Sequence, residues 1–387
     1  MRFRFKIRYA VLAAVNAAAI IGTGILTAAG SSMAKSQQYN YAFDRWKNGG
    51  KGSFGQVSCF FSDDAGFSED SVKMLRSQIK TDLENNISSK DPAMKNFIDA
   101  YSSPPQNVLF KGISGRRTES ELTAVGGNFF YFHNFMLLDG SYIYESDTMQ
   151  DGVVVDESLA WEIYGSDDVA GMDIYIDGVK FYIAGVVQDP QTKAEKKCRG
   201  KLPCAYITYE GVKLLSDYQS GGTGYDMMMS AYPELGKINS YEAVLPDPVK
   251  NFAYNTIKNK LAEQYKGNID IVDNTKRFSP SKRAKAHKKL AEYAIIKDKV
   301  RYPYWENASR YTEFRLTNIY WVRRPLFLIP CITLIWLVVI GYKALKAWAL
   351  KKWEMLTIIV DRKRIEIHEK KKEKRERKEA LRLQKKV

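Results

Sequence analysis

Four cysteines and three histidines are the side chains of this sequence best suited to covalent or metal chemistry. Cys198 and Cys204 bracket the short loop CRGKLPC, and such a loop can close to a disulfide in an oxidising compartment. The alternative is two unpaired thiols, because the spacing does not match the C-x-x-C pairs of zinc and redox sites. Cys59 stands alone, and Cys331 lies in an apolar run. We predict that Cys198 and Cys204 are oxidised in the mature protein.

Other reactive residue types stand in unpromising surroundings. His133 lies within the aromatic run FFYFHNF, where a packed imidazole is favoured over a metal ligand, and His287 lies among lysines. The acid pairs at 63–64 and 167–168 are adjacent in turns, and adjacency in a loop fixes no acid/base geometry. The sequence has no P-loop, since residues 49–53 are better explained as a linker, and it has no G-x-S-x-G or H-E-x-x-H motif. We therefore predict no enzyme, no catalytic residue, no metal site and no cofactor.

The charged residues are distributed unevenly along the chain, and most of the excess positive charge lies at its two ends. The net charge is +15, of which residues 1–8 contribute +4 and residues 343–387, with 17 Lys/Arg against 7 Asp/Glu, contribute +10. Cytoplasmic flanks of membrane spans are enriched in Lys and Arg. The pattern predicts that both ends are cytoplasmic and that residues 31–324 are extracytoplasmic, in a cell-membrane protein with two spans.

Two apolar segments lie just inside the basic ends. The sequence from Tyr9 to Ala34 has no charged residue, and we place a transmembrane helix at 9–30. The second span, 325–342, is short, but flanking Arg and Lys side chains can extend their charges to the two interfaces. A cleavable signal peptide is the alternative for the first segment. An uncleaved anchor is favoured, because the second span and its basic tail already fix the C-terminus inside.

Hydrophobic periodicity predicts the elements of the extracytoplasmic part. In its first third we expect a strand at 56–61, a helix at 68–87 capped by Ser68, a short helix at 92–101 and a strand at 108–110. Further on we expect a strand at 153–155, a helix from the cap Asp156 to Gly165, and a hairpin turning at Asp177-Gly178 whose second strand has a bulge or close packing at Gly185. The last third has expected strands at 205–209, 241–245 and 269–272, a helix at 247–265, and a charged, largely helical stalk at 280–321 that is broken near Pro303.

Between residues 122 and 211 the sequence resembles a known family. Five short segments follow one another in family order: GNFFYFHNFMLLDG (127–140), VVVDESLAWEIYG (153–165), Gly171, FYIAGVVQDP (181–190) and LPCAYITYEG (202–211). They are similar to the extracytoplasmic core domain of MacB-type ABC transporter permeases, in the FtsX-like permease superfamily.

The resemblance implies an α+β fold with two lobes. A porter-like α/β lobe would be split between residues 31–120 and residues 236–322, the latter including the stalk helix, and residues 121–235 would form an inserted β-rich lobe. The flanking parts would be the cytoplasmic N-terminus 1–8, the spans 9–30 and 325–342, and a cytoplasmic basic helix at 343–387.

Two departures limit what the resemblance carries over. The Gly-Arg pair of the family is Gly140-Ser141 here, so no role of that arginine transfers. The family's permeases continue past the second span through two more, whereas this sequence resembles a permease truncated to two transmembrane helices. The resemblance implies an ABC ATPase subunit and a fuller permease subunit as partners, and a peptide, lipid or envelope component as substrate or contact.

The basic tail has three readings. Residues 345–360 place apolar side chains on one helical face with lysines opposite, which suits a helix in the inner interface. The basic excess would then hold the tail to anionic lipid. The tail could instead dock a cytoplasmic partner, and nucleic acid is the least favoured ligand, because the last twenty residues offer no aromatic ring for stacking.

Two functions therefore compete. The first is a membrane subunit of an ABC-type export or mechanotransmission complex, a MacB-like component without its own ATPase. The second is a stand-alone membrane-anchored sensor or scaffold, whose extracytoplasmic domain binds a ligand or envelope partner.

Overall fold

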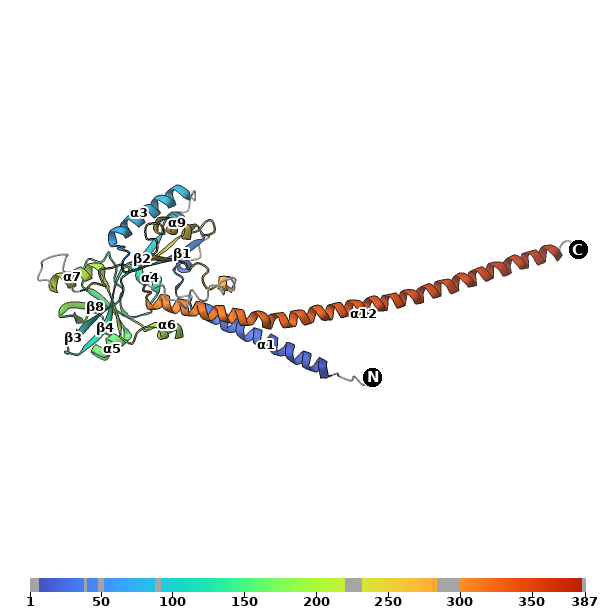
Figure 1. Ribbon diagram of the computed structural model, residues 1–387, viewed down its shortest axis with the longest axis horizontal. Helices are drawn as coiled ribbons and strands as arrows, with labels where there is room; N and C mark the ends of the chain where they lie inside the picture. Colours follow the sequence, from blue (N-terminus) through green and yellow to red (C-terminus); the bar gives the residue numbers. More distant parts are fainter. Residues whose placement is uncertain are drawn as a thin grey trace. The chain divides into compact units, whose positions relative to one another are not determined.

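The computed structural model describes residues 7–37, 40–47, 52–87, 92–219, 232–280, 282–283 and 299–384. It divides into two compact units, which we describe separately (Figure 1). One consists of Met1–Ile25 and Val322–Val387, and the other of Leu26–Trp321. The predicted basic N-terminus, His287 and residues 284–298 of the predicted stalk lie wholly or largely outside the described residues.

The first unit is built from two apolar helices. α1 spans Ile7–Lys35 and α12 spans Tyr304–Gln384, and both are long and apolar enough to cross a membrane by length and composition. They contain the predicted spans 9–30 and 325–342, whose boundaries stay predictions. A Cβ added to Gly22 would lie 3.4 Å from Leu326 Cδ1, so the two helices approach each other at this glycine. The choice between anchor and signal peptide for the first helix stays open.

The second unit is a mixed α+β domain built on one sheet, which confirms the α+β class. Within the described residues the sheet has eleven strands: β1 (Phe54–Phe61), β2 (Ile98–Ser102), β3 (Gln106–Gly112), β4 (Arg117–Gly127), β5 (Leu137–Gly140), β6 (Gly152–Asp156), β7 (Asp173–Ile176), β8 (Val179–Val187), β9 (Cys204–Thr208), β10 (Ser240–Pro246) and β11 (Ile269–Asp273). Most are buried on both faces, because helices and other strands cover them.

The sheet has an open part and a closed part. The strand order is β11-β1-β10-β2-β4-β3-β7-β8-β6-β9, and β9 also pairs with β4 in parallel. The run from β4 to β9 therefore closes on itself, while β11, β1, β10 and β2 continue as an open sheet. β4 belongs to both, since its start pairs with β3 and its end with β2. The division into lobes at 31–120, 121–235 and 236–322 remains a prediction.

Helices cover both parts of the sheet (Figure 1). They are α2 (Ala42–Lys47), α3 (Glu69–Asn86), α4 (Phe129–His133), α5 (Glu157–Tyr164), α6 (Lys193–Cys198), α7 (Tyr209–Gln219) and α9 (Phe252–Leu261), with a 3₁₀ turn at Pro92–Lys95. α3 and α9 pack side by side over the open sheet, and α5 packs on strands of the closed part.

Local sequence signals explain the elements that were predicted well. Ser68 caps α3, and the buried face of this helix consists of Val72, Leu75, Ile79 and Leu83. Asp156 caps α5 by accepting from Leu159 N, and Gly165 ends the helix in the left-handed conformation. The Asp177-Gly178 turn of the β7–β8 hairpin has positive φ at both residues, 48° and 91°.

Two expected elements differ from the structure, and a third agrees with it. The helix predicted at 92–101 is wrong, because only Pro92–Lys95 turns and Ile98–Ser102 pairs with β10 and β4 as strand β2. Sheet pairing has overridden local propensity there. The helix predicted from Asp247 begins at Phe252. The break predicted in the stalk near Pro303 is present, since Val300 bridges to Ser62 and α12 starts at Tyr304.

Candidate functional site at the start of the C-terminal helix

α12 begins inside the folded domain, directly after Pro303. Glu306, Arg310 and Glu313 follow at positions i, i+4 and i+7, so their side chains lie on one face of the helix. This face is buried against the loop after β11 instead of facing water, and its charges must therefore find partners within the domain.

A cluster of six charged side chains satisfies that requirement. Arg277 makes a bidentate pair with Glu306 at 2.7 Å for both contacts, and its Nη2 also donates to Glu313 Oε2 at 2.9 Å. Arg283 Nη1 lies 2.7 Å from Glu313 Oε1. These four side chains are at most 7% exposed. Burial would lower the pKa of Arg277, but Glu306 and Glu313 outweigh it and raise that pKa well above its usual value.

The cluster reaches strand β11 through a third arginine. Arg310 donates from Nε to Glu306 Oε1 at 2.7 Å and from Nη2 to Asp270 Oδ2 at 2.6 Å. Its guanidinium also stacks 3.8 Å from the centre of the Tyr302 ring, and Tyr302 donates to the same carboxylate. We call Asp270, Arg277, Arg283, Glu306, Arg310 and Glu313 the anchor cluster. Its three arginines balance its three carboxylates.

A polar chain continues from the anchor cluster into the sheet. Arg277 donates to Asn274 Oδ1 at 3.1 Å, and Asn274 donates to Ser58 Oγ on β1 at 2.7 Å. Ser58 donates in turn to Glu242 on β10 at 2.5 Å, and Glu242 lies 2.8 Å from His133 Nε2. Burial raises the pKa of Glu242, but His133 and the Ser58 hydrogen bond together outweigh it, so this pKa is lower than usual.

The first turn of α12 is therefore held at two points. Its charged face is tied to β1, β10 and β11 by the anchor cluster and the polar chain. On another side, Trp305 packs against α4, with ring centroids 4.6 Å from His133 and 5.6 Å from Phe129. Breaking one partner of a buried charge pair typically costs about 3–5 kcal/mol. This end of the helix is accordingly set to move together with the sheet.

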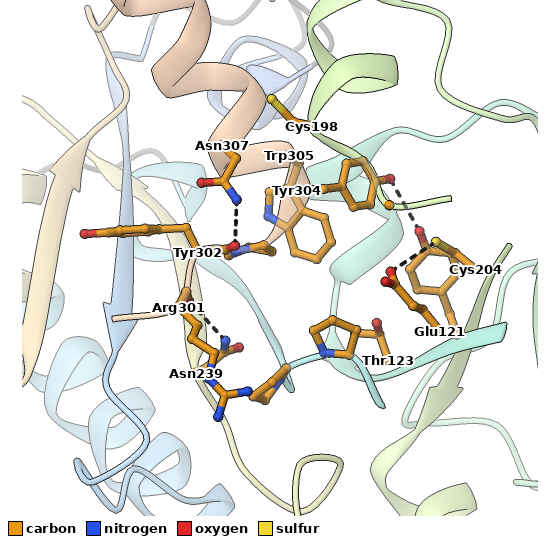
Figure 2. Close-up of a pocket in the computed structure, with 15 residues that line it drawn as sticks. Glu121, Thr123, Cys198, Cys204, Asn239, Arg301, Tyr302, Tyr304, Trp305 and Asn307 are labelled. Carbon is orange, nitrogen blue, oxygen red and sulfur yellow. Dashed lines mark hydrogen bonds between the residues drawn. The ribbon is translucent and has the colours of Figure 1, made fainter. Parts of the chain in front are cut away.

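A pocket of about 230 Å³ lies beside the same turn (Figure 2). Its floor comes from the parallel pair β4 and β9, where Glu121 is opposite Cys204 and Thr123 is opposite Tyr206. Alternate residues of a strand share a face, so all four side chains meet on one side of the sheet. The remaining lining residues are Pro104, Pro105, Cys198, Gly200, Asn239, Arg301, Tyr302, Pro303, Tyr304, Trp305 and Asn307.

The pocket contains both predicted disulfide cysteines. Cys198 ends α6, Cys204 starts β9, and the structure has both as free thiols. Cys204 Sγ is 4.0 Å from Glu121 Oε2, and burial raises the pKa of Cys204 to about 12. Burial also raises the pKa of Glu121, against the opposing charge of Arg199. The disulfide stays a prediction. Both thiols line the same pocket, as the prediction requires.

Asp156 holds the loop between these cysteines. Its carboxylate accepts from the Cys204 amide and pairs with Arg199, whose Nη1 also donates to Asp189 at 2.9 Å. The same carboxylate caps α5. The Arg199 guanidinium, whose charge acts on Glu121, is thus already engaged by two other carboxylates.

The other residues considered from sequence lie apart from this pocket. His133 is buried among Phe129, Phe135 and Trp305, as a packed imidazole. His368 is exposed on α12. Over the part of the chain that the structure describes, no group of three or more His, Cys, Asp or Glu side chains is arranged to hold a metal ion.

Sequence reasoning missed both the anchor cluster and Glu121. The sequence predicts only a charged, largely helical stalk at 280–321, and it singles out neither the charged face of this segment nor Glu121. One signal was available: Glu306, Arg310 and Glu313 share a helical face that also continues, in Leu316 and Tyr320, into buried residues. Charges in line with buried apolar residues indicate a buried charge network.

Comparison with known proteins gives structural neighbours only. No family model and no curated protein matches the sequence. The extracellular domain of the noncanonic ABC-type transporter YknZ from Gram-positive bacteria is 10% identical, with a TM-score of 0.36, over 56% of this chain and 99% of that one. The periplasmic region of MacB from Actinobacillus actinomycetemcomitans is 16% identical, with a TM-score of 0.38, over 60% and 92%. A domain of a putative permease protein from Porphyromonas gingivalis is 11% identical, with a TM-score of 0.32, over 57% and 89%.

The chain is thus similar to these three domains over 56–60% of its length, with TM-scores below 0.5.

Proposed function

We propose that this chain is a membrane subunit of an ABC-type export or mechanotransmission complex, a MacB-like component that relies on a separate ATPase. Its extracytoplasmic domain would contact a substrate or an envelope partner, and a fuller permease subunit would complete the complex. Both ends of the chain would be cytoplasmic, with residues 31–324 outside.

The observation that carries this proposal is the anchor cluster. α12 contains the apolar run 325–342. Buried charge pairs fix its first turns to β11 and the loop after it, and the polar chain continues from there to β1 and β10. A helix anchored in this way transmits a displacement to the sheet. A helix whose end lies in solvent would only bend. The MacB-like motifs and the two apolar helices support the same assignment.

Copurification tests the proposal. The full chain, tagged and extracted in mild detergent, should bring down an ABC ATPase and a second permease subunit. A chain that repeatedly emerges alone, under conditions that preserve established permease complexes, would show that the proposal is wrong and would favour the stand-alone sensor.

A variant of the anchor cluster tests the coupling. Arg277→Met leaves Glu306 and Glu313 without their shared partner, and we expect a loss of stability of about 3–5 kcal/mol. In the complex, the ATPase should remain bound while transport or substrate-stimulated ATP hydrolysis falls. Lys73→Met is the matched control, because Lys73 pairs with Asp70 on the exposed side of α3. Its stability and coupling should equal those of the wild type. Equal behaviour of the two variants would remove the anchor cluster from the mechanism.

A further inference from the structure

The Glu145 carboxylate, which belongs neither to the pocket nor to the anchor cluster, faces three donors. Its Oε1 accepts from the Gly127 amide at 2.7 Å, and its Oε2 lies 3.7 Å from Arg76 Nη1. The Tyr101 phenol donates a further hydrogen bond to the same carboxylate. Arg76 comes from α3, Tyr101 from β2 and Gly127 from the end of β4. A guanidinium, an amide and a hydroxyl that converge in this way recognise a carboxylate, and we call these three groups the carboxylate cradle.

Two adjacent glycines leave room for the carboxylate in the cradle. A Cβ on Gly126 would lie 2.5 Å from Glu145 Oε1 and 2.3 Å from Tyr101 Cζ, so a side chain at this position would fill the space. Gly127 has a φ of 61°, and a Cβ there would lie 2.5 Å from the Asp99 carbonyl oxygen. Glycine adopts this left-handed conformation without strain. The backbone of β4 therefore shapes the cradle together with the side chains.

Glu145 fits the cradle loosely. Arg76 donates from Nε and Nη2 to Asp99 at 2.8 and 2.9 Å, whereas its Nη1 lies 3.7 Å from Glu145. The outer pair is open to solvent, because the side chain of Arg76 is 32% exposed and that of Glu145 is 35% exposed. An exposed ion pair of this length contributes little to stability. A carboxylate that arrives from solution can therefore reach the same donors.

The loop that carries Glu145, residues 141–151 between β5 and β6, is held mainly near its ends. Ile143 is buried near the first end, and Gln150 accepts from Thr208 Oγ1 at 2.7 Å near the second. Residues 144–149 between these points are all exposed. On the side of α7, the loop borders a depression of about 390 Å³. The middle of the loop thus has room to move when Glu145 leaves the cradle.

We propose that the carboxylate cradle binds an acidic side chain of a partner protein, and that Glu145 occupies the cradle as an internal ligand until the partner takes its place. The loop 141–151 is then a strap that the resident carboxylate fastens and an incoming one releases. A glutamate-like ligand fits best because the resident group is itself a glutamate side chain. A C-terminal carboxylate is the other source of this chemistry. The inference rests on the proposed function only in taking the partner to be the extracytoplasmic contact of the complex.

Calorimetric titration of the full chain in detergent tests the site, with the variant Glu145→Ala to vacate the cradle. The amide of N-acetyl-L-glutamate carries one carboxylate, on its side chain. It should bind the variant about tenfold or more tightly than the wild type, because Glu145 competes for the wild-type site. Equal affinity for the two chains would overturn the role of Glu145 as an internal ligand.

Two further probes define the ligand chemistry in Glu145→Ala. The amide of N-acetyl-L-glutamine is uncharged and should bind about tenfold or more weakly than the acidic amide, since it cannot accept charge-assisted hydrogen bonds. Equal binding of these two amides would overturn the carboxylate site. N-acetyl-L-glutamine, whose carboxylate belongs to the main chain, should also bind more weakly than the acidic amide. Tighter binding of this probe would overturn the side-chain source.

Variants assign the binding to the cradle. Adding Tyr101→Phe to Glu145→Ala removes one donor but keeps the ring, and should weaken binding of the acidic amide severalfold. Unchanged affinity in this double variant would overturn the assignment. Glu119→Ala is the control: it removes an exposed glutamate elsewhere on β4, and it should bind the probe as the wild type does.

Limited proteolysis tests the strap. Chymotrypsin should cut after the exposed Tyr144 faster in Glu145→Ala than in the wild type or in Glu119→Ala. Equal rates would overturn the strap. Melting temperatures establish that the variants are folded, and if Glu145→Ala does not fold, Glu145→Gln replaces it in both measurements. Neither measurement needs an ATPase, so binding can fail while copurification succeeds, and the reverse.

Discussion

At the scale of single residues, the domain is organised by buried charges whose partners come from distant parts of the sequence. Glu242 on β10 is an example, since its carboxylate is held by Ser58 on β1 and by His133 on α4. These partners lie 184 and 109 positions away in the chain. Such a group links the stability of the domain to pH.

We predict that the stability contributed by Glu242 is lost in acid. Its pKa is lowered in the folded domain by His133 and Ser58, which outweigh the raising effect of burial. The contribution is therefore fully present above the unfolded pKa of about 4.3 and disappears as the pH falls through the lower folded pKa. Melting curves of the wild type and Glu242→Gln should differ at pH 7, by about 1.5–3 kcal/mol in free energy of unfolding.

The difference should shrink as the pH approaches 3. A difference that stays constant from pH 7 to pH 3 would mean that the carboxylate acts through its shape and not through its charge. Glu119→Gln, which alters an exposed carboxylate, serves as the control.

The second prediction at this scale is the Cys198–Cys204 disulfide. Oxidation would close a short loop that Asp156 and Arg199 already hold in place, with a stabilisation of about 2–3 kcal/mol. Peptide mapping without reduction should recover the two cysteines in one linked fragment. Recovery of both as free thiols would contradict the prediction.

At the scale of elements, strand β8 shows where backbone packing leaves no room for a side chain. A Cβ on Gly185 would lie 2.3 Å from the Ser141 carbonyl oxygen, and the pairing of β6 with β8 changes register at the same point. The sequence predicted this bulge or close packing from the glycine alone. Residues 138–141 run beside it in the same close contact.

We predict that Gly185→Ala destabilises the domain by about 1–3 kcal/mol, the usual cost of overpacking a well-packed site. Thermal melting measures the change. Lys180→Ala, at an exposed position of the same strand, should leave the melting temperature unchanged. A fully stable Gly185→Ala would show that β5 and β8 separate readily.

Elements with local signals were predictable, and those defined by distant pairing were not. Caps and turn residues fixed α3, α5 and the β7–β8 hairpin, because Ser68, Asp156 and Asp177-Gly178 act on neighbours a few positions away. The segment 98–102 looked helical, since nothing local announces its pairing with β10, some 140 residues later. The closure of β4 on β9 and the anchor cluster depend on such contacts too.

At the scale of the whole molecule, the question is what the basic C-terminal part of α12 does. Residues 343–387 carry most of the net charge, and the described part of this region is helical with exposed side chains. Anionic lipid attracts such a segment by about 1 kcal/mol per basic residue near the surface.

We predict that removing residues 343–387 weakens recruitment of the ATPase without abolishing it, because in the proposed complex the apolar helices would also contact partner subunits. Copurified ATPase per mole of tagged chain, compared between the full chain and the shortened one, measures the effect. Complete loss would favour a recruiting scaffold. A second variant, with the lysines at 370–372 and 374 replaced by glutamine, keeps the helix but lowers the net charge of this region from +10 to +6, and so tests how much of the effect depends on charge.

The short segment 301–305 closes one wall of the pocket and also leads into the first turn of α12. Any displacement of that turn changes the pocket, and any molecule seated in the pocket acts on the turn. Linkage makes this influence reciprocal, so the factor by which a movement of α12 changes ligand affinity is the factor by which the ligand shifts the equilibrium of that movement. Ligand binding at the pocket and movement of α12 would then be two parts of the same coupled equilibrium.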